Sequence, residues 1–405
     1  MFKKLHARLA AFGVILLVGA ALGLRYPYKT WEAIQAPDSV TQPMLPTDFS
    51  VYYRALERLD QGKTPYVAED SSPYKYSPGA LAILRALPND LSHAWVAYSA
   101  FSILMLMVGL ALGSRYASWD QVGLLGVGVI LAWKGILETL DYGQLELVIF
   151  GIAVLAFAIR RSVPLLAGVL AGTLPWLKLP WGLLLLPLIL VSTESLQKGG
   201  VKEKRTRIFI TGYVLAALAW GAGVPSVLFG SNRAMELTRE WIEILRVQPG
   251  DLYSTAINQS LWSTLHRWIS ESQLAVGLGL IGVSWLLGRL VIRSLSTHLT
   301  REVFVWVTPW LILIQLLNPL SWRWGSVFVI GAPLAAWRHD QGSSLGRSIL
   351  WGCVALLYLI QLNPVVQFLG YAHWTQFHEW GAVTLFWIAL LGLTLHRDRN
   401  SGASL

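Results

Sequence analysis

The sequence predicts an all-α polytopic membrane protein that forms a single integral membrane domain over residues 1–405. Two observations support this prediction. Hydrophobic residues make up 54% of the chain and charged residues only 14%, whereas an ordinary soluble domain carries about 25% charged residues. The apolar residues also occur in runs close to 20 residues long, which is the length of a helix that crosses the hydrocarbon core of a bilayer.

About twelve apolar segments, bounded by charged residues or by Gly and Pro, are expected to be transmembrane helices. They cover residues 9–24, 92–113, 120–138, 143–159, 163–176, 179–193, 208–228, 273–292, 302–318, 324–337, 347–362 and 380–395. Pro175 and Pro180 interrupt the short pair 163–176 and 179–193, so a break is expected between these two. The lone Cys353 lies inside a segment, which excludes a disulfide framework.

The distribution of basic residues predicts the orientation in the cell membrane. Lys3, Lys4 and Arg8 precede the first segment, which is expected to be an uncleaved anchor because Leu22–Tyr28 is a poor cleavage site. With both termini in the cytoplasm, the short cytoplasmic pieces hold 18 of the 32 Lys and Arg residues, as the positive-inside rule requires. The basic loop 194–207 is then a topology determinant. The net charge of +9 reflects topology and contact with membrane lipids, and does not indicate nucleic acid.

Two long outer loops, residues 25–91 and 229–272, hold most of the remaining Lys and Arg residues, and long loops cross the membrane largely regardless of charge. The apolar spacing in Asp48–Asp60 predicts an amphipathic helix that Gly62 ends, and Ser77–Pro88 predicts a second short helix. Both are expected to lie along the membrane surface. Arg233–Glu243 predicts a further surface helix in the second loop. Polar groups therefore converge on one side of the membrane.

Several short motifs resemble those of a known family. Asp48-Phe49 with Tyr52-Tyr53, then Gly62-x-x-Pro65-Tyr66 and Tyr76-x-Pro78, resemble the first outer loop of glycosyltransferase family 87. Later motifs follow in the same order: Gly143-Gln144, Lys178 with Pro180, Asn258-Gln259-Ser260 and Pro319-x-Ser321-Trp322. The resemblance extends from about residue 45 to 340. It implies a GT-C membrane fold and a mannosyltransferase-like enzyme that uses a polyprenyl-phosphate sugar.

The resemblance breaks down at one motif. The family's Ser-Pro-x-Ser-Trp motif is commonly followed by histidine, whereas Asn318 replaces the leading Ser here and Arg323-Trp324 follows Trp322. No role of that histidine carries over to this chain.

The resemblance makes Asp48 the candidate catalytic residue. A transfer from a lipid-phosphate sugar needs a carboxylate that takes the proton of the acceptor hydroxyl as its oxygen attacks the anomeric carbon. Asp is also a favoured residue at a helix N-terminus, where it faces the positive end of the dipole. Catalysis and helix capping are compatible.

Basic residues near the outer edge are candidates for binding the donor phosphate. Lys178 lies at the break between two apolar segments, where an ionisable residue is functional by default. Arg267 and Arg323 can bind phosphate oxygens bidentately. The alternative is that these side chains are anchored at the membrane interface, with Lys178 extended toward it.

Other residues of the matching motifs are candidate substrate-binding groups. The amides are equally expected to cap helices, and Glu146, inside a predicted segment, is expected either to be paired or to mark a cavity. The further candidates are Tyr52, Tyr53, Tyr66, Tyr76, Gln144, Asn258, Gln259, Ser321 and Trp322.

The sequence contains no motif for a metal or a bound cofactor. His373 and His378 do not share a helix face and have no evident third ligand, and the chain lacks Asp-x-Asp and a phosphate-binding P-loop. The lack of Asp-x-Asp favours a metal-independent lipid-monophosphate donor. By the resemblance, the expected partners are a polyprenyl-phosphate sugar, which is a co-substrate, and a glycolipid or glycan acceptor.

The leading interpretation is a membrane hexosyltransferase that moves a hexose, mannose by the resemblance, in an inverting single displacement on the outer face. Two alternatives remain. An O-antigen polymerase or ligase-like enzyme is also polytopic, although its large outer loop typically uses Arg and His. A lipid or solute transporter would place its ionisable residues near the bilayer midplane, often in repeated halves.

Overall fold

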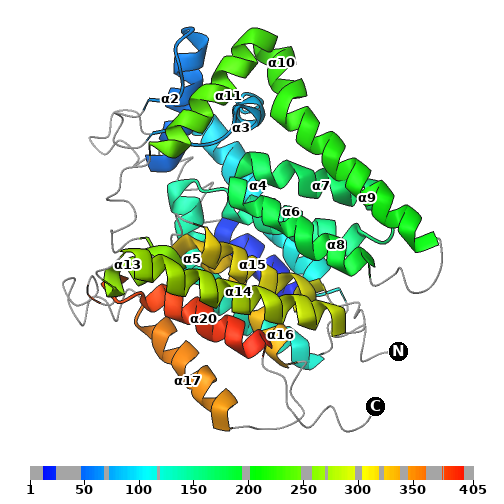
Figure 1. The fold of residues 1–405 in the computed structure, drawn as a ribbon, viewed down its shortest axis with the longest axis vertical. Helices are drawn as coiled ribbons and strands as arrows, with labels where there is room; N and C mark the ends of the chain where they lie inside the picture. Colours follow the sequence, from blue (N-terminus) through cyan, green and yellow to red (C-terminus); the bar gives the residue numbers. More distant parts are fainter. Residues whose placement is uncertain are drawn as a thin grey trace.

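The computed structural model describes residues 12–23, 47–67, 73–115, 119–193, 201–247, 258–269, 272–296, 303–318, 323–337, 345–361, 376 and 378–395. Within these ranges the regular structure is helical and no strand occurs, which confirms the predicted all-α class (Figure 1).

The described part of the chain contains the following helices. In chain order they are Phe12–Gly23, α2 (Thr47–Asp60), α3 (Pro78–Leu84), α4 (Leu91–Gly113), α5 (Trp119–Tyr142), α6 (Glu146–Ile159), α7 (Pro164–Leu177), the 3₁₀ helix η1 (Leu179–Leu184), α8 (Leu185–Thr193), α9 (Val201–Leu218), the π-helix η3 (Ala219–Gly223), α10 (Val224–Phe229), α11 (Ser231–Arg246), α13 (Leu261–Trp268), α14 (Ser272–Ser296), α15 (Val303–Leu317), the 3₁₀ helix η4 (Arg323–Val329), α16 (Ala332–Trp337), α17 (Leu345–Leu359) and α20 (Ala382–Leu395).

Each of the twelve predicted apolar segments coincides with an apolar helix in the described part of the chain. By length and composition, three helices there are able to cross a membrane: Leu91–Gly113, Val122–Tyr142 and Lys204–Phe229. The other apolar helices are 10–17 residues long. These helices are compatible with a membrane protein, and the number of crossings stays a prediction.

The helices form two groups that pack against each other (Figure 1). One contains α6, α7, α8 and α9, and the other contains α13 to α17 and α20, with α15 packed on α6 and α14 on α8. Helix α9 continues through η3 into α10, and the chain then turns back at Gly230. As a result α11 lies beside α3, which itself packs on α2.

Close packing of α7 on α9 depends on small residues. A Cβ atom added to Gly168 would lie 2.0 Å from the carbonyl oxygen of Phe209, and one added to Gly212 would lie 2.2 Å from that of Leu165. Small residues let helix backbones approach closely, which is the usual way in which helices associate in lipid.

Helix α2 confirms its sequence prediction, whereas α3 differs from it. Gly62, with φ 71°, follows the end of α2 as expected. Ser77 caps α3 by accepting from the backbone N–H of Ala80 at 3.2 Å. However, α3 ends at Leu84 rather than near Pro88, and neighbouring α10, α11 and α7 enclose it so that six of its seven residues are buried. The expectation that α3 lies along a membrane surface is therefore wrong.

The expected break after the first short apolar segment is present. Helix α7 ends at Leu177, Lys178 is extended with φ −158° and ψ 111°, and the chain resumes as η1. Pro180 lies in the first turn of η1, where it lacks only an N–H that has no helical partner. The break places the lysine at a junction between two helices.

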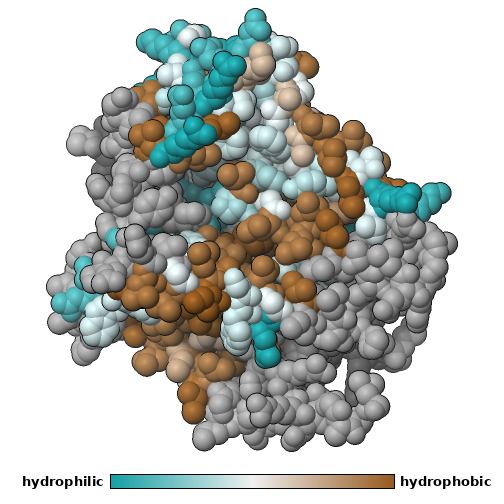
Figure 2. Space-filling model, viewed as in Figure 1, coloured by the Kyte–Doolittle hydropathy of each residue, from teal (hydrophilic) through white to brown (hydrophobic). Residues whose placement is uncertain are grey.

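Hydrophilic residues gather over α2 and α11, and again at the N-terminal end of α9 (Figure 2). Apolar residues cover the length of α9 and much of the lower group of helices (Figure 2). Among them, α9 exposes Val214, Leu215 and Leu218, and α14 exposes Leu278 and Ile281. Contiguous apolar surface of this kind is compatible with contact with lipid.

Two glycines of α5 offer a matched test of this packing. A Cβ atom at Gly128 would lie 1.9 Å from the carbonyl oxygen of Ile330, whereas one at Gly126 would meet nothing within 4 Å. We expect Gly128→Ala to lower the free energy of unfolding by about 1–3 kcal/mol through overpacking. Gly126→Ala is expected to be neutral or to stabilise the helix by up to about 1 kcal/mol. Thermal unfolding in detergent measures both, and equal effects would contradict the close contact.

Candidate active site

Asp48 lies in the first turn of α2 and is held by the turn that joins α5 to α6. Gln144 Nε2 donates a hydrogen bond to Asp48 Oδ2. Gly143 makes this contact possible in two ways. Its φ of 74° suits glycine, and a Cβ atom there would lie 2.7 Å from Cβ of Phe49. The Gly143-Gln144 motif therefore brings a backbone turn against α2, with the amide directed at the carboxylate.

The orientation of the Gln144 amide is set by a chain of tyrosine hydroxyls. Tyr52 Oη donates to Tyr76 Oη at 2.9 Å, and Tyr76 Oη donates to Gln144 Oε1 at 3.3 Å. Tyr98 Oη donates to the Gln144 carbonyl oxygen at 2.7 Å. Because Oε1 accepts from Tyr76, Nε2 is the atom that faces Asp48. The network thus presents a donor to the carboxylate.

Lys178 forms an ion pair with Glu146 beside this network. Glu146 is the first residue of α6, where a carboxylate faces the positive end of the helix dipole. The Glu146 side chain is 1% exposed and that of Lys178 is 17% exposed. Glu146 is therefore paired, one of the two outcomes expected of it, and Lys178 turns inward rather than extending toward an interface.

Electrostatic interactions join Asp48 to this ion pair. Burial raises the pKa of the Asp48 carboxyl, and the nearby charge of Glu146 raises it further. The hydrogen bond from Gln144 and the charges of Lys178 and Lys75 act in the opposite direction. Burial also raises the pKa of Tyr76 to about 12, so this phenol remains a neutral hydrogen-bond donor. A partly buried carboxylate with a raised pKa suits a general base.

Lys75 is a member of the site that the sequence did not single out. It lies between Tyr74 and Tyr76, and burial lowers the pKa of its ammonium while the charge of Asp48 opposes this shift. The sequence shows only that this lysine lies between two tyrosines in a turn-rich stretch. That pattern does not indicate that the lysine lies near Asp48. Tyr98, in α4, had no sequence signal at all.

Helix α11 fastens the first loop to the site. Trp241 Nε1 donates to the Lys75 carbonyl oxygen at 2.9 Å, and Thr64 Oγ1 donates to Glu240 Oε2 at 2.8 Å. Arg233 bonds Glu240 at 3.2 Å and the Lys63 carbonyl oxygen at 3.2 Å. Parts of the two long loops, which are far apart in the sequence, are therefore in contact: α11 of the second loop bonds residues 63, 64 and 75 of the first.

Two tyrosines of the first loop have different places from those expected of direct ligands. Tyr66 Oη donates to the Tyr76 carbonyl oxygen at 2.9 Å, and Tyr66 is buried, so it supports Tyr76 from behind. Tyr53 Oη donates to the Pro88 carbonyl oxygen, away from Asp48. The structure brings Tyr52 and Tyr76 to Gln144, and it uses Tyr53 to hold the end of the loop.

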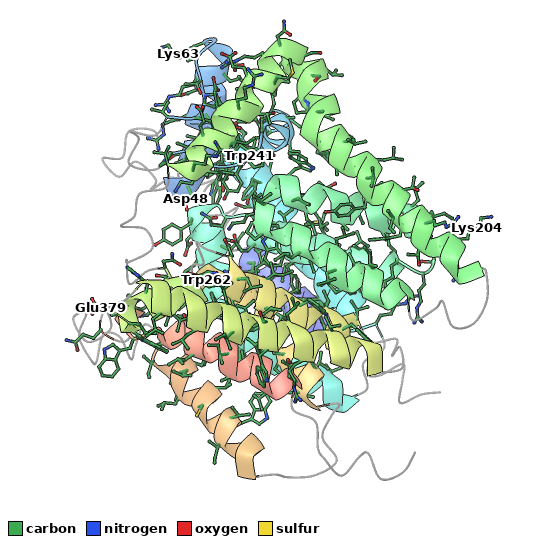
Figure 3. The ribbon with its side chains drawn as sticks, viewed as in Figure 1. Asp48, Lys63, Lys204, Trp241, Trp262 and Glu379 are labelled. Atoms are coloured by element: carbon green, nitrogen blue, oxygen red, sulfur yellow. The ribbon has the colours of Figure 1, made fainter. Side chains whose placement is uncertain are left out.

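Asn258, Gln259 and Arg267 lie in a separate polar cluster around α13. Figure 3 shows Trp262 of α13 and Glu379 in the lower group of helices, apart from Asp48. Asn258 Oδ1 accepts from the Ser260 N–H at 3.0 Å, and Gln259 Nε2 donates to the His378 carbonyl oxygen at 2.9 Å. Asn258 thus bonds a backbone group at the start of α13, which is the capping alternative expected of the amides, whereas Gln259 joins this start to the segment ahead of α20.

Arg267 ties this cluster together. Its guanidinium donates to the carbonyl oxygens of Asn258, at 2.9 Å, and Glu379, at 2.9 Å. It also donates to the hydroxyls of Ser263, at 2.6 Å, and Thr264, at 3.3 Å. These acceptors are protein groups in the first turn of α13 and ahead of α20, so the guanidinium serves to join two segments.

Three predicted site positions cannot be placed. Ser321 and Trp322 lie outside the described residues, as does the side chain of Arg323. His373 also lies outside them. Among the residues that the structure describes, no group of three or more His, Cys, Asp or Glu side chains is arranged to hold a metal ion.

Fold and site together define a helical protein in which a half-buried carboxylate lies within electrostatic reach of a buried lysine–glutamate ion pair. Residues 74–312 match the family model of glycosyltransferase family 87. This match covers more than half of the chain, and the chain therefore belongs to glycosyltransferase family 87 and is a glycosyltransferase. No curated protein matches it.

The family match includes most residues of the site but not Asp48. Tyr76, Gln144, Glu146 and Lys178 lie inside residues 74–312, whereas Asp48 precedes them. Asp48 is joined to the matched region through its hydrogen bond with Gln144. Its place in the site therefore rests on geometry rather than on the family match.

Substitution of Arg267 tests whether its role is structural. We expect Arg267→Gln to lower the free energy of unfolding by about 1–3 kcal/mol, because buried carbonyl and hydroxyl groups lose a charged donor. The KM for the sugar donor, measured on the folded fraction, should stay unchanged. Arg239→Gln in α11 is a suitable control, because Arg239 lies outside this cluster. A raised KM with unaltered thermal stability would instead show that Arg267 binds substrate.

Proposed function

We propose that this glycosyltransferase moves a hexose from a polyprenyl-phosphate sugar to a glycolipid or glycan acceptor, by inverting single displacement, on the outer face of the cell membrane. The observation that carries the proposal is the position of Asp48, which is oriented by Gln144 and lies close enough to the Lys178–Glu146 pair to sense both charges.

Asp48 is proposed to act as the general base. Its carboxylate takes the proton of the acceptor hydroxyl while the acceptor oxygen bonds to the anomeric carbon. The bond between that carbon and the phosphate oxygen breaks, and its electron pair leaves with the polyprenyl phosphate. Gln144 keeps the carboxylate in one orientation, which raises the fraction of encounters with reactive geometry.

Lys178 is proposed to bind the phosphate of the donor. The ammonium of Lys178 is largely buried, with a side chain 17% exposed, and a buried charge interacts strongly with a phosphate oxygen because the effective dielectric constant is low. The charge of the lysine also stabilises the negative charge that develops on the leaving group. Lys75, in the first loop, is proposed to contribute in the same way. Mannose is proposed as the hexose on the family resemblance alone.

The proposed topology places the site and the basic loop on opposite faces. Lys204–Phe229 forms one helical run of 26 residues, which spans roughly 39 Å at about 1.5 Å per residue. This exceeds the roughly 30 Å of a bilayer core. Figure 3 shows Lys204 at one end of this run and Lys63 of the first loop near the other. With Lys204 in the cytoplasm, Asp48 lies toward the outer face, as in a GT-C membrane enzyme with about twelve spans.

A transporter is the second candidate, and the helical architecture is its only support. The ion pair of the site lies at a helix start and a helix break rather than at the middle of a span. Transport also gives no reason for a carboxylate held by a neutral amide. The polymerase or ligase alternative differs in its acceptor, and the assay below separates it by its product.

Asp48→Asn tests the proposed base. In membranes supplied with radiolabelled polyprenyl-phosphate mannose, we expect transfer to glycolipid to fall by at least about 100-fold, because a general base typically contributes that much or more. Asp60→Asn is the matched control. It lies at the other end of the same helix, where its carboxylate bonds Arg85 at 2.5 Å and is well exposed. Undiminished transfer by Asp48→Asn would exclude the proposed base, and uptake into vesicles without a covalent product would favour transport.

Gln144→Leu tests whether the hydrogen bond from Gln144 sets the pKa of the Asp48 carboxyl. The hydrogen bond from Gln144 lowers the pKa of Asp48, so its loss raises that pKa. A base works only when deprotonated, and the acidic limb of the kcat/KM profile should therefore move to higher pH. Gln61→Leu, in the exposed turn beyond α2, should leave the profile unchanged. A profile that moves to lower pH in Gln144→Leu would contradict the assignment of Asp48 as the titrating base.

A further inference from the structure

The two carboxylate oxygens of Glu146 have different surroundings. Oε1 accepts a hydrogen bond from Lys178 Nζ, whereas Oε2 is buried and has no hydrogen-bond partner among the described residues. An ionised group that is 1% exposed is normally paired and also hydrogen-bonded on its remaining positions. Glu146 therefore uses only one of its two carboxylate oxygens, the one that faces Lys178.

Glu146 also belongs to the immediate surroundings of the site. Its charge acts on the carboxyl of Asp48 and on the phenol of Tyr76. Glu146 takes no part in the proton transfer to Asp48, although it holds the ammonium that is proposed to bind the donor phosphate. Because Glu146 already binds the ammonium of Lys178, its carboxylate competes with the donor phosphate for that ammonium.

The competition affects the product more than the donor, because the two ligands carry different charges. The site contains two carboxylates, Asp48 and Glu146, and two ammonium groups, Lys75 and Lys178. The donor is a phosphodiester with one negative charge. After transfer, Asp48 carries the acceptor's proton and the leaving group is a phosphate monoester, which carries up to two charges near neutral pH. A lysine without a counter-charge would bind this product more tightly than the donor.

We propose that Glu146 is a counter-charge that competes with the lipid phosphate for Lys178, so that the more highly charged product is released instead of being retained. This inference rests on the proposed function, because it needs a lipid-phosphate donor at Lys178. Glu146 is then a specificity-determining residue for the charge of the ligand. Release of product limits the turnover of many enzymes, and a resident competitor accelerates it.

The test compares the affinity for product and donor in Glu146→Gln. Farnesyl phosphate, a short polyprenyl phosphate, serves as the product probe, and its Ki is measured against the polyprenyl-phosphate mannose donor. We expect the Ki to fall on the order of tenfold, equivalent to about 1.4 kcal/mol, while the KM for the donor falls less. Lys178→Gln should raise the Ki.

Glu236→Gln is the matched control for loss of one carboxylate. Glu236 forms an exposed pair with Arg233 at 2.6 Å, with a side chain 61% exposed, and exposed pairs contribute little. An unchanged or raised Ki in Glu146→Gln would overturn the proposal, because it would show that Glu146 only holds Lys178 in place.

A second variant and a binding measurement distinguish failure of the proposed function from failure of the inference about Glu146. If Glu146→Gln is not monodisperse in detergent, Glu146→Asp keeps the charge but shortens the side chain by one methylene group. The contact with Lys178 is then weaker, and the Ki should fall by a smaller factor. Calorimetric binding of farnesyl phosphate compares the variants without turnover. Wild-type protein that binds farnesyl phosphate but transfers no sugar would refute the proposed function. Normal transfer with no tighter binding in either Glu146 variant would refute this inference alone.

Discussion

The hydrogen bond between Gln144 and Asp48 is the contact on which the site depends. It joins the first turn of α2 to the turn between α5 and α6, and it requires a glycine at position 143 because any side chain there would collide with Phe49. The tyrosine hydroxyls then decide which amide atom faces the carboxylate. The close backbone approach at Gly143 thereby fixes the orientation of the Asp48 carboxylate.

Charged groups in a largely buried site are stable only when each has a partner of opposite charge. Two unit charges about 4 Å apart interact by about 4 kcal/mol at an effective dielectric constant of 20, and a buried charge without a partner costs several kcal/mol. The site has two acidic and two basic groups, Asp48, Glu146, Lys75 and Lys178. This balance explains how ionisable residues can lie beside apolar helices, and it leaves the lysines available to an anionic ligand that displaces a carboxylate.

The sequence predicted the elements better than their contacts. The limits of α2 and the break at Lys178 follow from local signals, namely apolar spacing, Gly62 and the two prolines. The burial of α3 does not, because α10 and α11 cover it from more than 100 residues further along the chain. Of the predicted site residues, Tyr52, Tyr76, Gln144 and Lys178 gather around Asp48, whereas Arg267 and its neighbours form a structural cluster around α13.

The sequence by itself determined the helical class, the positions of the apolar segments and the identity of the chemically able residues, because these depend on composition and on spacing along one helix. Only the tertiary structure decided which of those residues meet. Glu146 pairs with Lys178, and Lys75 lies near Asp48, because loops distant in sequence pack together. Distances between groups on separate helices depend on packing and close backbone contacts, and no local pattern records them.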